Sequence, residues 1–545
     1  MNLKMLEIAK NLVSINSVNT TVGEKEIGLY IEQYLRELPY FKEHPELVIV
    51  QKLKDDPLER RNVFALLIGE KEKCPDTILL HGHTDTVGIE DYGLLEEVAC
   101  NPDELEKRLK EIPLPKEVRE DLESGEYLFG RGACDMKSGD AVFLGLMEEL
   151  SNHPETLRGN ILVSFNPVEE NLHTGIIEGL DTLLQLKETY GLEYKLAINN
   201  DYICPLYPGD TTKTIYTGTV GKLLPCFYIQ GKETHVGQCF EGFDASFAAA
   251  KLVEKISLNT EFCDGYEGEY SLPPSVLKLK DLKPWYNVQT ACDAFVYFNY
   301  FVHNASMEEI TKKLVDAAKE AMKDTSRHVK EEARKFALLN GEEPKEYNID
   351  YQVLTYEELC KELVESGSCT SGELKELVQQ VTEDAIRKKV DQREIPIEII
   401  KKLLTMGKRK DPSAILYYAA PYCPHNTLQN EETHYITEIE AIAKKVGDRK
   451  QEEYRMMKFF PSLSDSSYLK IDDSKESIDR LKNNFPAFDM LYPVPIETIQ
   501  KLNIPAVNYG CYGKDAHKWT ERVYMPYTFD VLPELILETI SYYLM

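Results

Sequence analysis

The 545-residue sequence has no run of about 18 apolar residues, the length that a membrane-spanning helix needs. Basic residues are few: 63 Lys and Arg stand against 92 Asp and Glu, so the formal net charge is −29. A surface of this charge repels phosphate backbones and anionic lipids. We therefore expect neither nucleic acid nor a membrane as a partner.

Cysteine pairs at metal-binding spacing are also missing. The 12 cysteines are scattered without a Cys-x-x-Cys pair, which argues against a structural zinc site on cysteine. Several lie inside apolar runs, and reduced buried thiols are typical of a cytoplasmic protein. The first ten residues place apolar positions at helical spacing between charges, which indicates an amphipathic helix rather than a signal peptide.

The pattern that is present predicts an α/β protein of several domains. Over residues 1–213, short apolar runs alternate with amphipathic stretches, which indicates a mixed, largely parallel sheet sandwiched by helices. Residues 214–355 change to a β-α-β-β-α-β order, a small domain inserted into the larger one. Residues 356–450 are mostly helical and charged, with one apolar strand at 414–419, and predict a helical extension packed on the larger domain. Residues 451–545 return to α/β character and complete that domain.

Potential metal ligands follow the predicted strands at the points where the strands end. Because the carboxyl ends of parallel strands meet at one edge of a sheet, such residues are expected to lie close together. The candidates are His81, His83, Asp85, Asp135, Glu169, Glu170, Asp201 and His517. Asp210, in the turn after Asp201, is an alternative to it.

These residue types favour a two-metal site. Two histidines and three carboxylates suit two borderline divalent ions that share a bridging carboxylate, and one glutamate is left over to carry protons. His81 lies on the same strand face as His83, and we interpret it as a neighbour of the site rather than a ligand. His173, just after the glutamate pair, is interpreted as a loop histidine. The inventory predicts a two-metal amide hydrolase.

Four motifs in the same order resemble those of the M20 peptidase family, which includes aminoacylases, carboxypeptidases and dipeptidases. Its Gly-His-x-Asp-x-Val motif is present at residues 82–87, and its Gly-Arg-Gly-x-x-Asp-Met-Lys motif at residues 130–137. Its Glu-Glu pair is present at residues 169–170, and its His-x-x-x-Glu motif at residues 517–521.

The resemblance implies a role for each matching residue. His83 and Asp201 would hold one metal ion, Glu170 and His517 the other, and Asp135 would bridge the two. Asp85 would orient His83, and Glu169 would be the general base. The implied cofactors are two divalent ions, zinc first, with cobalt or manganese as alternatives.

The inserted domain at residues 214–355 is similar to the family's lid domain. Its Gly-x-x-x-His-x-Gly loop matches residues 231–237, which makes His235 the expected oxyanion stabiliser, and Asn287 the expected substrate contact. Relatives that grip a substrate carboxylate often carry an arginine on the following strand, but residues 294–302 contain none. The lid often carries dimer contacts, so a monomer or a homodimer through the lid is expected.

Among subgroups, residues 419–425 and 460–468 resemble the RocB-like arginine-utilisation proteins. This resemblance implies a cytoplasmic enzyme of amino-acid catabolism that hydrolyses a short peptide or an N-acyl amino acid. The alternative is a catalytically inactive relative that binds such ligands or a protein partner. The presence of Glu169 favours the enzyme, because a binding protein gains nothing from a general base.

Overall fold

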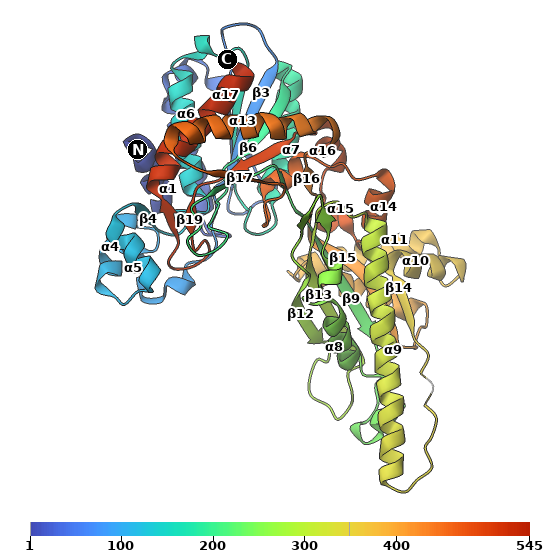
Figure 1. Cartoon of the computed structure of the whole chain (residues 1–545). Coiled ribbons are helices and arrows are strands. Elements are labelled where there is room, and N and C mark those ends of the chain that lie inside the picture. Colours follow the sequence, from blue (N-terminus) through green and yellow to red (C-terminus); the bar gives the residue numbers. More distant parts are fainter. Residues whose placement is uncertain (1, 348) are drawn as a thin grey trace. The chain divides into compact units, whose positions relative to one another are not determined.

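The computed structural model describes residues 2–347 and 349–545, and the chain divides into two compact units (Figure 1). Unit 1 comprises Met1–Val220, Pro424–Ile471 and Pro495–Met545, and unit 2 comprises Gly221–Cys423 and Asp472–Val494. In the part of the chain that the structure describes, no helix combines the length and the apolar content that crossing a bilayer requires.

Unit 1 is built on an eight-stranded sheet with the order β1-β2-β5-β3-β6-β18-β7-β17. Its centre runs parallel from β5 through β3 and β6 to β18, whereas the β1–β2, β2–β5 and β18–β7 pairs are antiparallel. The central strands consist mostly of buried apolar residues, as expected for strands covered on both faces. The strands are β1 (Val48–Lys52), β2 (Arg61–Leu67), β3 (Asp76–His83), β5 (Asn160–Asn166), β6 (Glu193–Asn199), β7 (Lys213–Tyr216), β17 (Tyr454–Met457) and β18 (Ala506–Tyr509).

Helices cover both faces of this sheet. Gly28 of α2 lies against the Arg61 side chain, whereas Gly179 of α7 lies against Phe64, and residues 61 and 64 of one strand point to opposite faces. Helices α6 and α17 pack on β3, and α1 packs on α6. The helices of unit 1 are α1 (Leu3–Ser14), α2 (Gly23–Glu37), α3 (Pro39–Glu43), α4 (Pro102–Glu111), α5 (Lys116–Ser124), α6 (Lys137–Ser151), α7 (Thr174–Tyr190), α13 (Thr433–Lys450), α16 (Ile496–Leu502) and α17 (Leu532–Leu544).

Two small sheets complete unit 1. The first has the order β19-β20-β4, and the second pairs β16 with β8. Their strands are β4 (Tyr127–Phe129), β8 (Gly218–Thr219), β16 (Asn426–Thr427), β19 (Gly513–Lys514) and β20 (Arg522–Tyr524). The mixed α/β sheet sandwiched by helices, expected from the sequence, is thus confirmed for unit 1.

Unit 2 contains a five-stranded sheet with the order β12-β13-β9-β15-β14. The expected β-α-β-β-α-β order is present as β9, α8, β12, β13, α9 and β14. However, β15 lies between β9 and β14, antiparallel to β9 and parallel to β14. All eleven residues of β15 are buried, and a strand this apolar is stable only between two others and beneath helices. The bounds are β9 (Gly221–Gln230), β12 (Ser275–Asp281), β13 (Asp293–Val302), β14 (Gln352–Thr355), β15 (Ser413–Cys423), α8 (Ala245–Ile256) and α9 (Met307–Leu339), with a two-stranded hairpin of β10 (Gly265–Tyr266) and β11 (Glu269–Tyr270).

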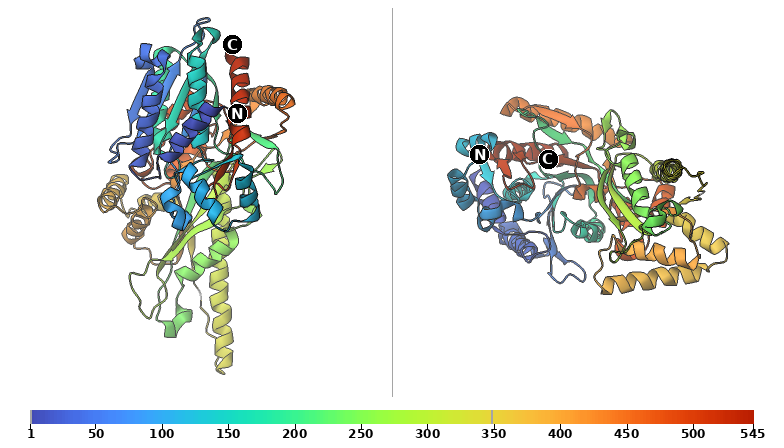
Figure 2. Two further views of the ribbon diagram at one scale, coloured as in Figure 1. Left: turned by 90° about the vertical axis from the view of Figure 1, so that its left-hand side faces the viewer. Right: turned by 90° about the horizontal axis from the view of Figure 1, so that it is seen from below.

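Helices cover both faces of this sheet too (Figure 2). On one face, Thr311 of α9 hydrogen-bonds Tyr418 of β15 at 2.9 Å between the hydroxyls, and α8 packs on β12 and β13. On the other face, Ile400 and Leu403 pack in one apolar cluster with Tyr417, Tyr228 and their neighbours. The helices that supply this cluster are α10 (Tyr356–Glu365), α11 (Ser371–Arg387) and α12 (Ile395–Met406), with Leu491 added by α15 (Phe488–Leu491). Unit 2 also contains α14 (Lys475–Asn483).

The two units differ from the domain boundaries expected from the sequence. The segment 356–423, expected as an extension packed on the larger domain, belongs to unit 2, because α10–α12 bury their apolar faces on the five-stranded sheet. The residues 424–450, including α13, remain in unit 1, where α13 packs on α17. The segment 472–494 also belongs to unit 2, where the backbone carbonyl of Asn484 accepts a hydrogen bond from the backbone N–H of Tyr418.

Candidate metal centre

Five predicted metal ligands lie together at the carboxyl ends of the parallel strands of unit 1. His83 is the last residue of β3, Glu170 follows β5, and Asp201 follows β6. Asp135 comes from the turn before α6, and His517 from the loop between β19 and β20. They form two groups, His83–Asp135–Asp201 and Asp135–Glu170–His517, and within each group the ligand atoms lie within 4.8 Å of one another.

Asp135 belongs to both groups and presents one oxygen to each histidine. Its Oδ1 lies 3.0 Å from His83 Nε2, and its Oδ2 lies 3.0 Å from His517 Nε2. His517 Nε2 also lies 2.8 Å from Glu170 Oε1. Asp201 is held nearby by its backbone carbonyl, which accepts a hydrogen bond from the Asn508 side chain at 2.9 Å. A carboxylate with an imidazole nitrogen at each oxygen is the arrangement that a bridging ligand requires.

The electrostatics of the groups match those of a cation site. Hydrogen bonds to Asp135 and Glu170 raise the pKa of His517 to about 11. Burial disfavours charge on His83, yet the hydrogen bond to Asp135 and the surrounding carboxylates raise its pKa well above the usual range. Burial likewise opposes charge on Asp135, but the two histidines hold its pKa below the ordinary value. The carboxylates thus demand nearby positive charge, and this set of nitrogen and oxygen donors fits two borderline divalent ions.

Asp85 connects the glutamate pair to the strand that carries His83. Its carboxylate accepts the backbone N–H groups of Glu169 at 3.0 Å and Glu170 at 3.1 Å, and the Asn19 side-chain amide at 2.8 Å. The closest contact of His83 Nδ1 is the backbone carbonyl of Asp85 at 3.1 Å, while the Asp85 carboxylate is 3.7 Å away. The Asp85 carboxylate therefore anchors the loop that carries both glutamates, in addition to lying near His83.

Glu521 fixes the turn that carries Asp135. Its buried carboxylate accepts the backbone N–H groups of Cys134 at 3.0 Å and Asp135 at 3.2 Å, and pairs with Arg131 at 2.8 Å. In the sequence, Glu521 is recognisable only as the end of the His-x-x-x-Glu motif. The motif spacing was the available signal, since it places Glu521 four residues after His517.

Glu169 lies in a third group, with His173 and Asp465, in which the ligand atoms are again within 4.8 Å of one another. His173 Nδ1 lies 3.0 Å from Asp465 Oδ1 and 3.9 Å from Glu169 Oε1. Burial, followed by repulsion from Glu170 and Asp465, raises the pKa of Glu169 well above the usual range. His173, interpreted from the sequence as a loop histidine, is buried, and Asp465 had no assigned role.

The two alternative ligands lie outside these groups. His81 Nε2 forms a hydrogen bond with Ser466 Oγ at 2.9 Å, in agreement with its interpretation as a neighbour. Asp210 pairs with Arg455 at 2.6 Å and accepts backbone N–H groups of its own turn, so the structure places Asp201 and not Asp210 with the other ligands.

The remaining predicted site residues, His235 and Asn287, belong to unit 2. His235 is exposed, and its Nδ1 accepts the backbone N–H of Gly237 at 3.1 Å. A neutral ring with this acceptor carries its proton on Nε2, which is then a hydrogen-bond donor. Asn287 is half-buried and donates from Nδ2 to Gln289 Oε1 at 2.9 Å. Gln289 forms a β-bridge with His235, so both residues belong to one pair of loops.

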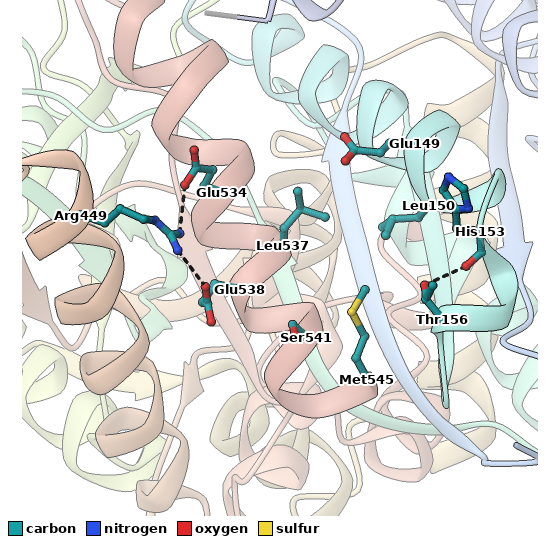
Figure 3. Close-up of a pocket in the computed structure, with 10 residues that line it drawn as sticks. All are labelled: Glu149, Leu150, His153, Thr156, Arg449, Glu534, Leu537, Glu538, Ser541 and Met545. Atoms are coloured by element: carbon teal, nitrogen blue, oxygen red, sulfur yellow. Dashed lines mark hydrogen bonds and ion pairs between the residues drawn. The ribbon is translucent and has the colours of Figure 1, made fainter. Parts of the chain in front are cut away.

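A separate groove of about 580 Å³ lies in unit 1 among residues of α6, α13 and α17 (Figure 3). Arg449 reaches Glu534 at 2.9 Å and Glu538 at 3.5 Å across one side of it. The lining residues include none of the predicted ligands. Its main cation is thus already paired, and we assign the groove no function.

Comparisons with known proteins relate the chain to a family of peptidases. Residues 79–347 match the model of Peptidase family M20/M25/M40. The protein RocB of Bacillus subtilis (strain 168) is 38% identical over 538 residues, which cover 98% of this chain and 93% of RocB.

Two solved structures share the fold. A tripeptidase from Staphylococcus aureus has a TM-score of 0.51 at 15% identity, over 99% of this chain and 98% of its own. The YXEP protein of Bacillus subtilis, described as a dinuclear metal-binding peptidase, has a TM-score of 0.50 at 11% identity, over 99% of this chain and 97% of its own.

Proposed function

Because this chain belongs to peptidase family M20/M25/M40, we propose that it is a two-metal hydrolase that cleaves an amide bond of a short peptide or an N-acyl amino acid. One observation carries the proposal: two groups of histidine and carboxylate ligands share Asp135, and the buried carboxylate of Glu169, the residue before Glu170, interacts electrostatically with His83. A scissile carbonyl bound there would have both an electrophilic site and a base within reach.

In this proposal His83 and Asp201 hold one ion, Glu170 and His517 hold the second, and Asp135 is shared by both. We expect zinc, with cobalt or manganese as substitutes, because the donors are imidazole and carboxylate. When bound, such ions supply Lewis acidity, which polarises a carbonyl and makes water a stronger acid.

Glu169 is the proposed general base. Its carboxylate takes a proton from the attacking water and passes it to the nitrogen of the leaving amine. The Asp85 carboxylate supports this role, because it holds the backbone of Glu169 and Glu170 in one position.

His235 is the proposed oxyanion stabiliser. The hydrogen bond from Gly237 to Nδ1 leaves Nε2–H as a donor, which is the form needed to stabilise a developing oxyanion. Asn287, which lies in the loop paired with that of His235, is the proposed substrate contact.

We propose a role in arginine or amino-acid catabolism from the similarity to RocB, and short peptides as first substrates from the similarity to a tripeptidase. All 12 cysteines are free, a state typical of the cytoplasm, where we propose that the reaction occurs.

The test combines metal analysis with a substrate screen. We expect the purified protein to contain divalent metal and to hydrolyse some members of a panel of dipeptides, tripeptides and N-acyl amino acids, and chelation to abolish turnover. Glu169→Ala should lower turnover about 10²–10⁴-fold while retaining the metal. A folded protein without divalent metal, or an active Glu169→Ala variant, would contradict the proposal. Substrate binding without turnover by the metal-loaded wild type would instead identify an inactive relative.

A further inference from the structure

We propose that Glu169, His173 and Asp465 form a third divalent-cation site, and that an ion bound there inhibits the hydrolase. The inhibitory part of this inference rests on the proposed function, because it requires Glu169 to be the general base. The binding part does not depend on that role and rests on the three side chains themselves.

The donor set of the third group is the same as that of the other two. Each group has one imidazole and two carboxylates, with one ligand atom per residue and all ligand atoms within 4.8 Å. The separation of 3.0 Å between His173 Nδ1 and Asp465 Oδ1 equals that between His83 Nε2 and Asp135 Oδ1. An ion such as zinc, with ligands at about 2.0–2.2 Å, requires this kind of spacing between donors.

The charge and burial of the group favour a cation. Glu169, His173 and Asp465 are exposed by only 7%, 1% and 2%. Asp465 Oδ2 is buried and has no hydrogen-bond partner among the described residues. Two carboxylates and one imidazole in so dry a place lack sufficient positive charge, and a divalent ion would supply it.

The three side chains are already held in place by their surroundings. The loop that carries Glu169 is closed by a hydrogen bond from the His173 backbone N–H to the Val168 carbonyl at 2.8 Å. The ring of Tyr468 packs against that of His173 with centroids 5.2 Å apart. Asp465 begins the short helical segment Asp465–Leu469, where the Ser464 hydroxyl accepts the N–H of Ser466. A cation would therefore find a preorganised site.

Occupancy of this site would remove the free carboxylate of Glu169. A carboxylate that ligates a cation cannot also accept a proton from water, so turnover should fall as the third ion binds. The third group has three ligands of its own, whereas the other two share Asp135 and form one five-ligand centre. We expect the shared centre to fill first and the third site to fill at higher metal concentration.

The experiment titrates zinc chloride into the metal-free protein, measures the number of bound ions by calorimetry and elemental analysis, and follows turnover at each zinc concentration. The variants are Asp465→Asn and His173→Gln, each of which removes one donor with little change in shape. His153→Gln is the matched control, because the exposed His153 pairs with Glu155 but belongs to none of the three groups.

We expect three ions in the wild type and in His153→Gln, but two in Asp465→Asn and in His173→Gln. Zinc in excess should inhibit the wild type, and inhibition of either variant should need at least about tenfold more zinc. Even the loss of a group that only hydrogen-bonds a metal ligand lowers metal affinity about 10–100-fold. For each protein, we compare turnover at low zinc with turnover at excess zinc as a ratio. A variant whose overall activity differs from that of the wild type can therefore still be compared with it.

Two bound ions in the wild type, three in both variants, or inhibition that is unchanged in both variants would overturn the proposal. A variant that still binds two zinc ions tightly is folded. If one variant has lost these two ions, the ion count and inhibition of the other variant decide the outcome. If no substrate is turned over, the proposed function fails, while the ion count still decides whether the third site exists.

Discussion

Both units bury a mixed sheet between helices, but they distribute polar side chains differently. In unit 1, β3 runs parallel to both β5 and β6, with His83 beside Asn166 and His81 beside Asn199, so three strands end at one edge. In unit 2, β9 ends at Gln230, where its antiparallel neighbours β13 and β15 begin. Parallel pairing thus gathers residues that follow strands, whereas antiparallel pairing sends them to opposite edges.

The largest effect is expected from Asp135→Ala, which removes the residue common to both groups. Loss of both ions forfeits several kcal/mol of transition-state stabilisation, so turnover should fall at least about 10³-fold, measured together with metal content. Asp210→Asn, which changes a carboxylate outside the groups, is the control and should retain the metal. A metal-loaded, active Asp135→Ala protein would show that Asp135 is not the shared ligand of the centre.

A smaller effect is expected in unit 2 from His235→Ala. Loss of one oxyanion donor costs about 10²–10³-fold in kcat, and metal content should stay the same because His235 belongs to no metal group. His328→Ala, an exposed histidine of the same unit, is the control. Equal kcat values for His235→Ala and His328→Ala would show that His235 of unit 2 takes no part in the reaction.

Glu521→Gln should have a smaller effect again, because Glu521 acts through the Asp135 turn and not on an ion. We expect a loss of about 10–100-fold in metal affinity, measured by competition with a chelator. Glu453→Gln, an exposed glutamate of unit 1, should bind metal as the wild type does. Unchanged affinity in Glu521→Gln would mean that the turn holds its position without this carboxylate.

The smallest effect on the chemistry is expected from Leu403→Ala on α12. Leu403 is fully buried in the apolar cluster of unit 2, so its truncation should destabilise that unit by about 2–5 kcal/mol, measured by denaturant unfolding. Metal affinity should not change, since all the ligands are in unit 1. Lys402→Ala, at an exposed neighbouring position, is the control. A lowered metal affinity in Leu403→Ala would show that the units are energetically coupled.

The sequence was most informative where local pattern and chemistry coincide. His83, Asp135 and Glu170 could be predicted because each follows an apolar strand or a glycine-rich turn, and the structure brings them together. The pairing of His173 with Asp465 could not be predicted, since 292 residues separate them and neither position indicates that the other will be its neighbour.

The sheet on which α10–α12 pack could not be predicted from the sequence either. Their amphipathic pattern predicts helices, but an apolar helix face does not specify which sheet it will cover. That choice depends on β15, whose insertion beside β9 creates the surface on which Ile400 and Leu403 pack. Strand order in a sheet is set by long-range pairing, which local sequence does not encode.

The ligands of the candidate centre extend from His83 to His517, and this spread has a consequence for biosynthesis. At about 5–20 residues per second, a ribosome needs roughly 20–90 s to proceed from the first of these ligands to the last. During that interval the growing chain gains Asp135, Glu170 and Asp201 but still lacks His517, so the group of Asp135, Glu170 and His517 cannot yet exist. Ions can therefore fill the complete centre only after His517 has been synthesised.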